Sequence, residues 1–127
     1  MEIGARLGGG CITTHLVPLS TGVNMVEANI RIALGETPDL CKKYDKGAAI
    51  RFLQPLPGIF KSVEGVDEAR GISGVIEVGF MKKIGEVIPE LSNGLDRVGY
   101  VITQGNTRDP FLCRQLCQLS AQLLDEI

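Results

Sequence analysis

The first ten residues contain the groups of this chain that are best suited to chemistry. They are Glu2, Arg6 and the consecutive glycines Gly8, Gly9 and Gly10. A carboxylate can hold Mg²⁺, a guanidinium can bind anionic oxygens through two parallel hydrogen bonds, and glycines let backbone amides approach a ligand closely. This combination suits the chemistry of phosphate groups. The competing interpretation is a purely structural turn, because glycine-rich turns commonly follow strands.

Two helices are expected after the glycines. The first has near-helical apolar spacing, and Pro18 is expected to limit it to about two turns. The second begins with Asn24 and Glu27, which form a capping-box pattern, and it stops at Gly35. The apolar stripe of the second helix consists of Val26, Ile30, Ala33 and Leu34. Residues 37–47 mix proline, charge and glycine without a period, as expected of an exposed connection.

The pattern changes to strands after residue 47. Alternating or β-rich segments predict strands in the ranges 48–56, 58–63, 73–81 and 97–105. One helical turn is expected within 64–71, and the Asn93–Gly94 pair predicts a tight turn with positive φ. Asp109 and Pro110 begin a final helix, whose apolar positions are Leu112, Leu116, Leu119, Leu123 and Ile127.

This order of elements predicts an α+β fold. A parallel sheet would need helices between its strands, so a run of strands favours an antiparallel sheet. We expect a short helical lead-in over residues 1–46, followed by a domain over residues 47–127 in which the C-terminal helix covers the sheet.

Composition excludes several classes of partner. The formal net charge is -2, so no excess of positive charge draws the chain to nucleic acid or to anionic membranes. Aromatic residues make up 5% of the chain and tryptophan is absent, which argues against base-stacking surfaces. No secretory signal or membrane-spanning run is apparent, so we expect a cytoplasmic protein whose four cysteines are reduced.

Two long segments resemble a known enzyme family. Residues 2–36, "EIGARLGGGCITTHLVPLSTGVNMVEANIRIALGE", are similar to the end of the ATP-binding region of ATP-grasp carboxylate-amine ligases. In that region a strand carries Glu-x-Asn-x-Arg, and a glycine-rich loop leads into a helix pair. Residues 73–107, "SGVIEVGFMKKIGEVIPELSNGLDRVGYVITQGNT", resemble the C-terminal domain of the L-amino-acid ligase branch.

The resemblance implies ATP-dependent joining of a carboxylate, such as an amino acid, to an amine through an acyl phosphate. It implies that Glu2 binds Mg²⁺, that Arg6 stabilises the acyl phosphate and the transferring phosphoryl group, and that the amide of Gly9 helps to hold developing negative charge. Gly4 stands where many members have a metal-binding Asn, which implies either a water ligand or a weaker metal site.

The nucleotide-binding lobes of such enzymes precede this motif, and the chain shows none of their features. We therefore expect a C-terminal fragment that has no ligase activity and binds neither ATP nor Mg²⁺ alone. An alternative is a stand-alone α+β module that binds a small carboxylate or a protein partner. A third interpretation is self-association of the chain through exposed strand edges.

Four further features have simple structural interpretations. His15 is expected to be partly buried or on the surface, because nothing nearby in the sequence forms a pair with it. Cys11 is expected to pack between loop and helix, and Glu77 is expected to face outward from its strand. Cys113 and Cys117 are expected to pack in the core rather than to bind metal.

Overall fold

The structure is a computed structural model that describes residues 4–106. The expected metal ligand Glu2 and the expected C-terminal helix, with Cys113 and Cys117, lie outside the described residues. The expected fold class is confirmed, since a few helices accompany an antiparallel sheet.

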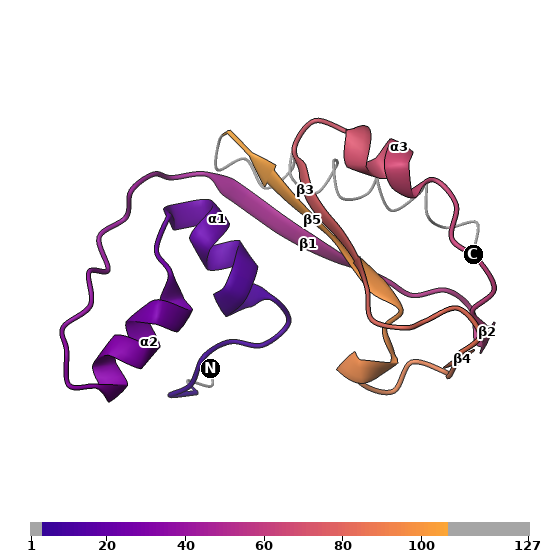
Figure 1. Ribbon diagram of the computed structural model, residues 1–127, viewed down its shortest axis with the longest axis horizontal. Helices are drawn as coiled ribbons and strands as arrows, with labels where there is room; N and C mark the ends of the chain where they lie inside the picture. The colour runs from indigo at the N-terminus through magenta and orange to yellow at the C-terminus, as the bar shows by residue number, and fades with distance from the viewer. Residues whose placement is uncertain (1–3, 107–127) are drawn as a thin grey trace.

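The elements of the described part follow one another in the expected order (Figure 1). They are the π-helical turn η1 (Ile12–Leu16), α1 (Val17–Thr21), α2 (Met25–Ala33), β1 (Gly47–Leu53), β2 (Gly58–Ile59), α3 (Val66–Gly71), β3 (Val75–Phe80), β4 (Val87–Ile88), the 3₁₀ turn η2 (Gly94–Asp96) and β5 (Gly99–Gly105). The strand expected over 58–63 is thus much shorter, and β4 was not foreseen because only two residues of its segment form a ladder.

Strand β5 is the centre of a three-stranded antiparallel sheet of order β1-β5-β3. It pairs with β1 over its whole length, from Gly99 opposite Leu53 to Gly105 opposite Gly47. Most of its residues are buried, because it has a neighbour on both sides and elements packed on both faces. The short strands β2 and β4 form a separate antiparallel pair.

The two faces of the sheet have different coverings. On one face, Leu53, Val78 and Val101 form a buried cluster with Ala69 of α3. The residues that alternate with them point to the other face, where η1 and α1 lie against β1. On that face the side chain of Gln104 donates a hydrogen bond of 2.6 Å to the carbonyl oxygen of Leu19. The helical lead-in is therefore tied directly to the sheet.

The first helix differs from the expectation at Pro18, since it continues through this residue. The amides of Leu16 and Val17 donate to carbonyls five residues back, so this stretch is a π-helical turn. Pro18 then lies in the first turn of α1, where the absence of its N–H removes no helical hydrogen bond.

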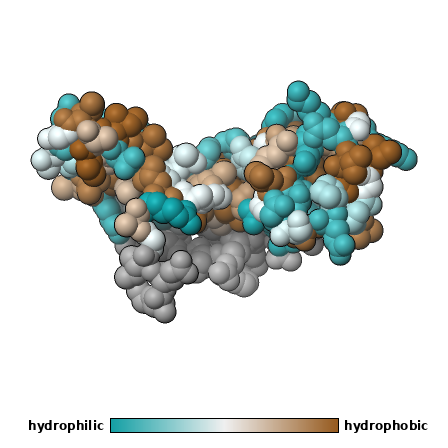
Figure 2. Space-filling model, turned by 90° about the horizontal axis from the view of Figure 1, so that it is seen from below, coloured by the Kyte–Doolittle hydropathy of each residue, from teal (hydrophilic) through white to brown (hydrophobic). Residues whose placement is uncertain are grey.

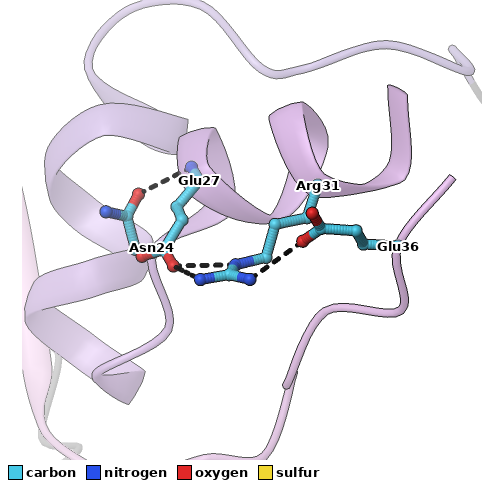
Figure 3. A network of polar contacts seen from close by, with 4 residues as sticks. All are labelled: Asn24, Glu27, Arg31 and Glu36. Carbon is cyan, nitrogen blue, oxygen red and sulfur yellow. Dashed lines mark hydrogen bonds and ion pairs between the residues drawn. The ribbon is translucent and has the colours of Figure 1, made fainter. Parts of the chain in front are cut away.

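The second helix begins and ends where the sequence predicts. The side chain of Asn24 accepts a hydrogen bond of 3.1 Å from the amide of Glu27, and Gly35 after the helix has φ of 79°. On the polar side of α2, Arg31 bridges Glu27 and Glu36 (Figure 3). The apolar side of α2 is largely exposed, which differs from the usual arrangement of an amphipathic helix.

The expected positive-φ turn at Asn93–Gly94 is wrong. Asn93 is extended and caps η2, because its side chain accepts a hydrogen bond of 2.8 Å from the amide of Leu95. The carboxylate of Asp96 accepts in return from the amide of Asn93 at 2.8 Å. The reciprocal capping box satisfies these donors without left-handed backbone.

Replacing Gly99 by alanine is expected to destabilise the fold by about 1–3 kcal/mol. A Cβ at this position would lie 2.6 Å from the carbonyl oxygen of Gly79 and 3.2 Å from Leu53 Cδ1. The backbone of β3 would have to move, so the cost cannot be relieved by a rotamer change. Urea denaturation monitored by circular dichroism measures the difference.

The matched control is Gly58→Ala on β2, where a Cβ would meet nothing within 4 Å. This variant should change the free energy of unfolding by no more than about 0.5 kcal/mol. Equal stability of the two variants would contradict the close approach of β3 and β5.

Candidate functional site

The glycine-rich loop is held in a defined conformation. Gly10 and Cys11 both have left-handed backbone, with φ of 61° and 64°. The hydroxyl of the buried Thr13 donates a hydrogen bond of 2.8 Å to the carbonyl oxygen of Gly8, and the amide of Ile12 donates to Gly9 at 3.2 Å. The loop carbonyls therefore point back toward η1, which leaves the loop amides free to face other groups.

The amides of the loop have no acceptor among the residues that the structure describes. Among residues 4–106, the N–H groups of Gly8, Gly9, Gly10 and Cys11 donate no hydrogen bond to another residue. The side of Gly9 where a Cβ would stand has no atom of the described residues within 4 Å. Backbone amides that lack an acceptor in a turn of this kind can bind an anion.

Arg6 is exposed shortly before this loop. Its guanidinium donates one hydrogen bond of 3.2 Å to the carbonyl oxygen of Leu7 and forms no ion pair within the described part of the chain. Most of its donors are thus free for an external anion. No atom of the Arg6 side chain lies within 4 Å of the position that a Cβ on Gly9 would occupy.

The loop lies over the sheet at Phe52. A Cβ on Gly10 would stand 3.9 Å from Phe52 Cζ. Phe52 in turn packs edge-on against its cross-strand neighbour Tyr100, with ring centroids 6.5 Å apart. The Tyr100 ring occupies the space above Gly79, where a Cβ would lie 2.5 Å from the ring. Two aromatic rings thus form the surface beneath the loop.

A chain of polar contacts connects the sheet to η1. The hydroxyl of Tyr100 donates a hydrogen bond of 2.6 Å to Glu77 Oε1, and His15 Nε2 lies 3.4 Å from Glu77 Oε2. His15 Nδ1 contacts the hydroxyl of Thr14 at 2.7 Å. His15 is partly exposed, as expected, and the carboxylate beside it, that of Glu77, comes from a strand that is distant in the sequence.

Glu77 points away from the buried core cluster, as expected, but it lies next to η1 instead of facing only solvent. Glu77 shares the face of Gly79 and Tyr100, on which η1 packs, and its side chain is 40% exposed. The sequence signal was the alternation of Glu77 with the buried Val78, which places the carboxylate opposite the core. Sequence reasoning missed this contact because it could not place η1 on that face.

The environment of Glu77 favours the protonated forms of the Tyr100 hydroxyl and the Cys11 thiol. The hydrogen bond to Glu77 is the main cause that raises the pKa of Tyr100 to about 12, followed by burial and the charge of Glu77. Burial, and then the charge of Glu77, raise the pKa of the Cys11 thiol. Cys11 is therefore a neutral thiol at physiological pH, which agrees with its expected packing role rather than with a nucleophile.

Within residues 4–106 no group of three His, Cys, Asp or Glu side chains could hold a metal ion. In the same part of the chain, no helix is long and apolar enough to cross a membrane. The site therefore combines loop amides that have no acceptor among the described residues, an exposed guanidinium and an aromatic surface.

Parts of the chain are similar to a known protein family and to solved structures. The family model "L-amino acid ligase C-terminal domain 2" matches residues 51–112. A crystal structure of phosphoribosylglycinamide synthetase from Anaerococcus prevotii superposes with a TM-score of 0.78 and 21% identity over 96% of the chain. The L-amino acid ligase from Bacillus licheniformis superposes with a TM-score of 0.74 and 20% identity over 95% of the chain.

The chain spans a minor part of each of these relatives. It covers 31% of the first solved structure and 30% of the second. It is also 30% identical to "Uncharacterized protein y4rH" from Sinorhizobium fredii over 109 aligned residues. This alignment covers 85% of the chain and 23% of that protein.

The contact between Tyr100 and Glu77 predicts an alkaline titration. The Tyr44→Phe variant leaves Tyr100 as the remaining tyrosine, and its tyrosinate absorbance should rise with a midpoint of about pH 12. Adding Glu77→Gln should lower the midpoint, because it removes the carboxylate that holds the phenolic proton. An unchanged midpoint in this double variant would contradict the contact.

The same shift predicts how stability depends on pH. The pKa of Tyr100 is raised from 10.0 to about 12 by folding. The contribution of Tyr100 to the free energy of unfolding is thus complete below pH 10. It is lost between pH 10 and about 12, because there the unfolded chain releases the phenolic proton more readily than the folded chain. Tyr100→Phe should show a smaller loss of stability across that window in urea denaturation.

Proposed function

Because the chain is related to the C-terminal part of ATP-grasp ligases, we propose that it supplies one wall of the active site of an ATP-dependent carboxylate-amine ligase. In the proposed reaction a carboxylate attacks the γ-phosphorus of ATP and ADP leaves. An amine then attacks the acyl phosphate, with release of phosphate and a proton. The proposed acid is an amino acid or another small carboxylate.

The observation that carries this proposal is a loop whose amides have no acceptor among the described residues, with an exposed guanidinium a few residues earlier in the chain. The amides of Gly8–Cys11 have no acceptor in the described part of the chain. Phosphoryl transfer depends mostly on positioning and on neutralisation of charge. We assign to Arg6 the stabilisation of the transferring phosphoryl group, and to the Gly9 amide a hydrogen bond to a developing oxyanion.

The metal requirement of such a reaction is met only in part by this chain. Gly4 has no side-chain oxygen, and residues 4–106 contain no group of three suitable ligands. The described residues therefore do not form a Mg²⁺ site. The proposed ligand Glu2 lies outside them, and further oxygens must come from ATP or from another part of the enzyme.

The exposed face of α2 supports the proposal that further protein belongs here. Val26, Ile30 and Leu34 repeat every four residues along the helix and are 37%, 55% and 70% exposed. Among the residues of α2, only Ala28 is buried. Figure 2 shows this apolar surface on the lobe that contains α2. An amphipathic helix with its apolar side in water lacks the surface against which it packs.

We assign residues 1–46 to the end of an ATP-grasp domain and residues 47–127 to a C-terminal domain. The family match, which begins at residue 51, supports this division. The nucleotide-binding lobes would then pack on α2, and the chain alone would be inactive.

The test compares the chain alone with a chimera in which it replaces the matched part of the Bacillus licheniformis L-amino acid ligase. With ATP, Mg²⁺ and amino acids, the chain alone should release no ADP and the chimera should release it. Arg6→Ala should lower kcat of the chimera by about 10²–10³-fold.

Arg51→Ala is the control for Arg6→Ala, because Arg51 is an exposed arginine on β1. It should leave kcat unchanged. ADP release by the chain alone would overturn the fragment proposal. Binding of a small carboxylate by the chain, with an inactive chimera, would favour a stand-alone binding module.

The role of α2 is tested by the double variant Ile30→Ser with Leu34→Ser. Since both side chains are exposed, the free energy of unfolding of the isolated chain should change by no more than about 0.5 kcal/mol for each substitution. The same variant in the chimera should lower its melting temperature and its ADP release. Leu56→Ser, at a residue that is 88% exposed outside α2, should do neither.

A further inference from the structure

Arg97 is an arginine that pairs with no carboxylate of the described residues. Its guanidinium carbon lies 3.8 Å from the centroid of the Phe52 ring. Its Nε atom is buried and has no hydrogen-bond partner. Within residues 4–106 it forms no ion pair. A cation held in place without a carboxylate is available to bind an anion.

The carboxylate next to Arg97 in the sequence, that of Asp96, is hydrogen-bonded to other residues. The carboxylate of Asp96 accepts hydrogen bonds from the amide and the hydroxyl of Ser92, both at 2.9 Å, and from the amide of Asn93 at 2.8 Å. The contact with the amide of Asn93 belongs to the capping box of η2. The local turn therefore keeps Asp96 from pairing with Arg97.

Arg97 and the glycine-rich loop share one aromatic ring. The guanidinium stacks over the face of Phe52, and Gly10 lies at the Cζ end of the same ring. Stacking fixes the plane of the guanidinium while leaving its edge open to a ligand. Gly94 lies close to the same guanidinium, since a Cβ on it would stand 3.9 Å from Arg97 Nη1.

We propose that Arg97 binds the carboxylate of a small substrate held over the glycine-rich loop. Because Nε is buried, the carboxylate would be bound end-on by the two Nη groups, whose parallel N–H bonds match its two oxygens. The loop amides and Arg6 would remain free for phosphoryl oxygens. This inference rests on the proposed function, since it adds a carboxylate subsite to the same loop.

The experiment follows the isotope-labelled chain by NMR, where the Nε–Hε group of Arg97 and the amides of Gly8–Gly10 give separate signals. The chain is titrated with sodium acetate, and with sodium phosphate in a second series, at constant ionic strength. Acetate should shift the Arg97 signal and the Gly10 amide.

Arg97→Gln should weaken acetate binding about fivefold or more, as followed by the Gly10 amide, and Arg97→Lys, which keeps the charge but not the planar fork, should also weaken it. Arg51→Gln is the matched control. Arg51 adjoins Phe52 on β1 and therefore points to the opposite face of the sheet. It should leave the acetate affinity unchanged.

The remaining outcomes separate this inference from the proposed function. Phosphate shifts confined to the amides of Gly8–Gly10, with Arg97 unmoved by either anion, would overturn the carboxylate subsite and leave the phosphate-binding loop in place. A shift of Arg97 by phosphate but not by acetate would also overturn it. If none of these NMR signals shifts with either anion, the proposed carboxylate subsite is wrong. The proposed function is then still tested separately, by ADP release from the chimera.

Discussion

The pairing of β5 with both β1 and β3 is the constraint on which the rest of the structure depends. The strand satisfies its backbone hydrogen bonds on two sides, and its alternating side chains face two different layers. Val101 joins the cluster beneath α3, whereas Tyr100 and Gln104 face the helical lead-in. Gly99 lets β3 approach closely enough for this arrangement. Both the core and the candidate site therefore depend on one strand.

The candidate site is formed where the glycine-rich loop meets the sheet. Phe52 contacts the loop at Gly10, and Arg97 stacks on the same ring. Beside them, Glu77 accepts the hydroxyl hydrogen of Tyr100 and lies next to His15. These contacts position the loop amides without occupying them. The loop thus lies over Phe52, and its amides have no acceptor among the described residues, as the proposed anion site requires.

Local signals were sufficient for the elements whose ends depend on nearby residues. Asn24 and Gly35 delimit α2, because a cap and a left-handed residue act within a few positions of the helix end. Pro18 and the Asn93–Gly94 pair misled the prediction, since each permits more than one local geometry. A π-helical turn absorbed the proline, and a capping box formed by Asp96 displaced the positive-φ turn.

The sequence by itself determined the α+β class and the order of the elements, because these depend on composition, spacing and short-range chemistry. Only the tertiary structure decided which face of the sheet receives the loop. It brought Glu77 to His15 and Arg97 to Phe52 across long separations in the chain. Strand pairing and packing set such contacts, and periodicity in one segment does not specify its neighbour in space.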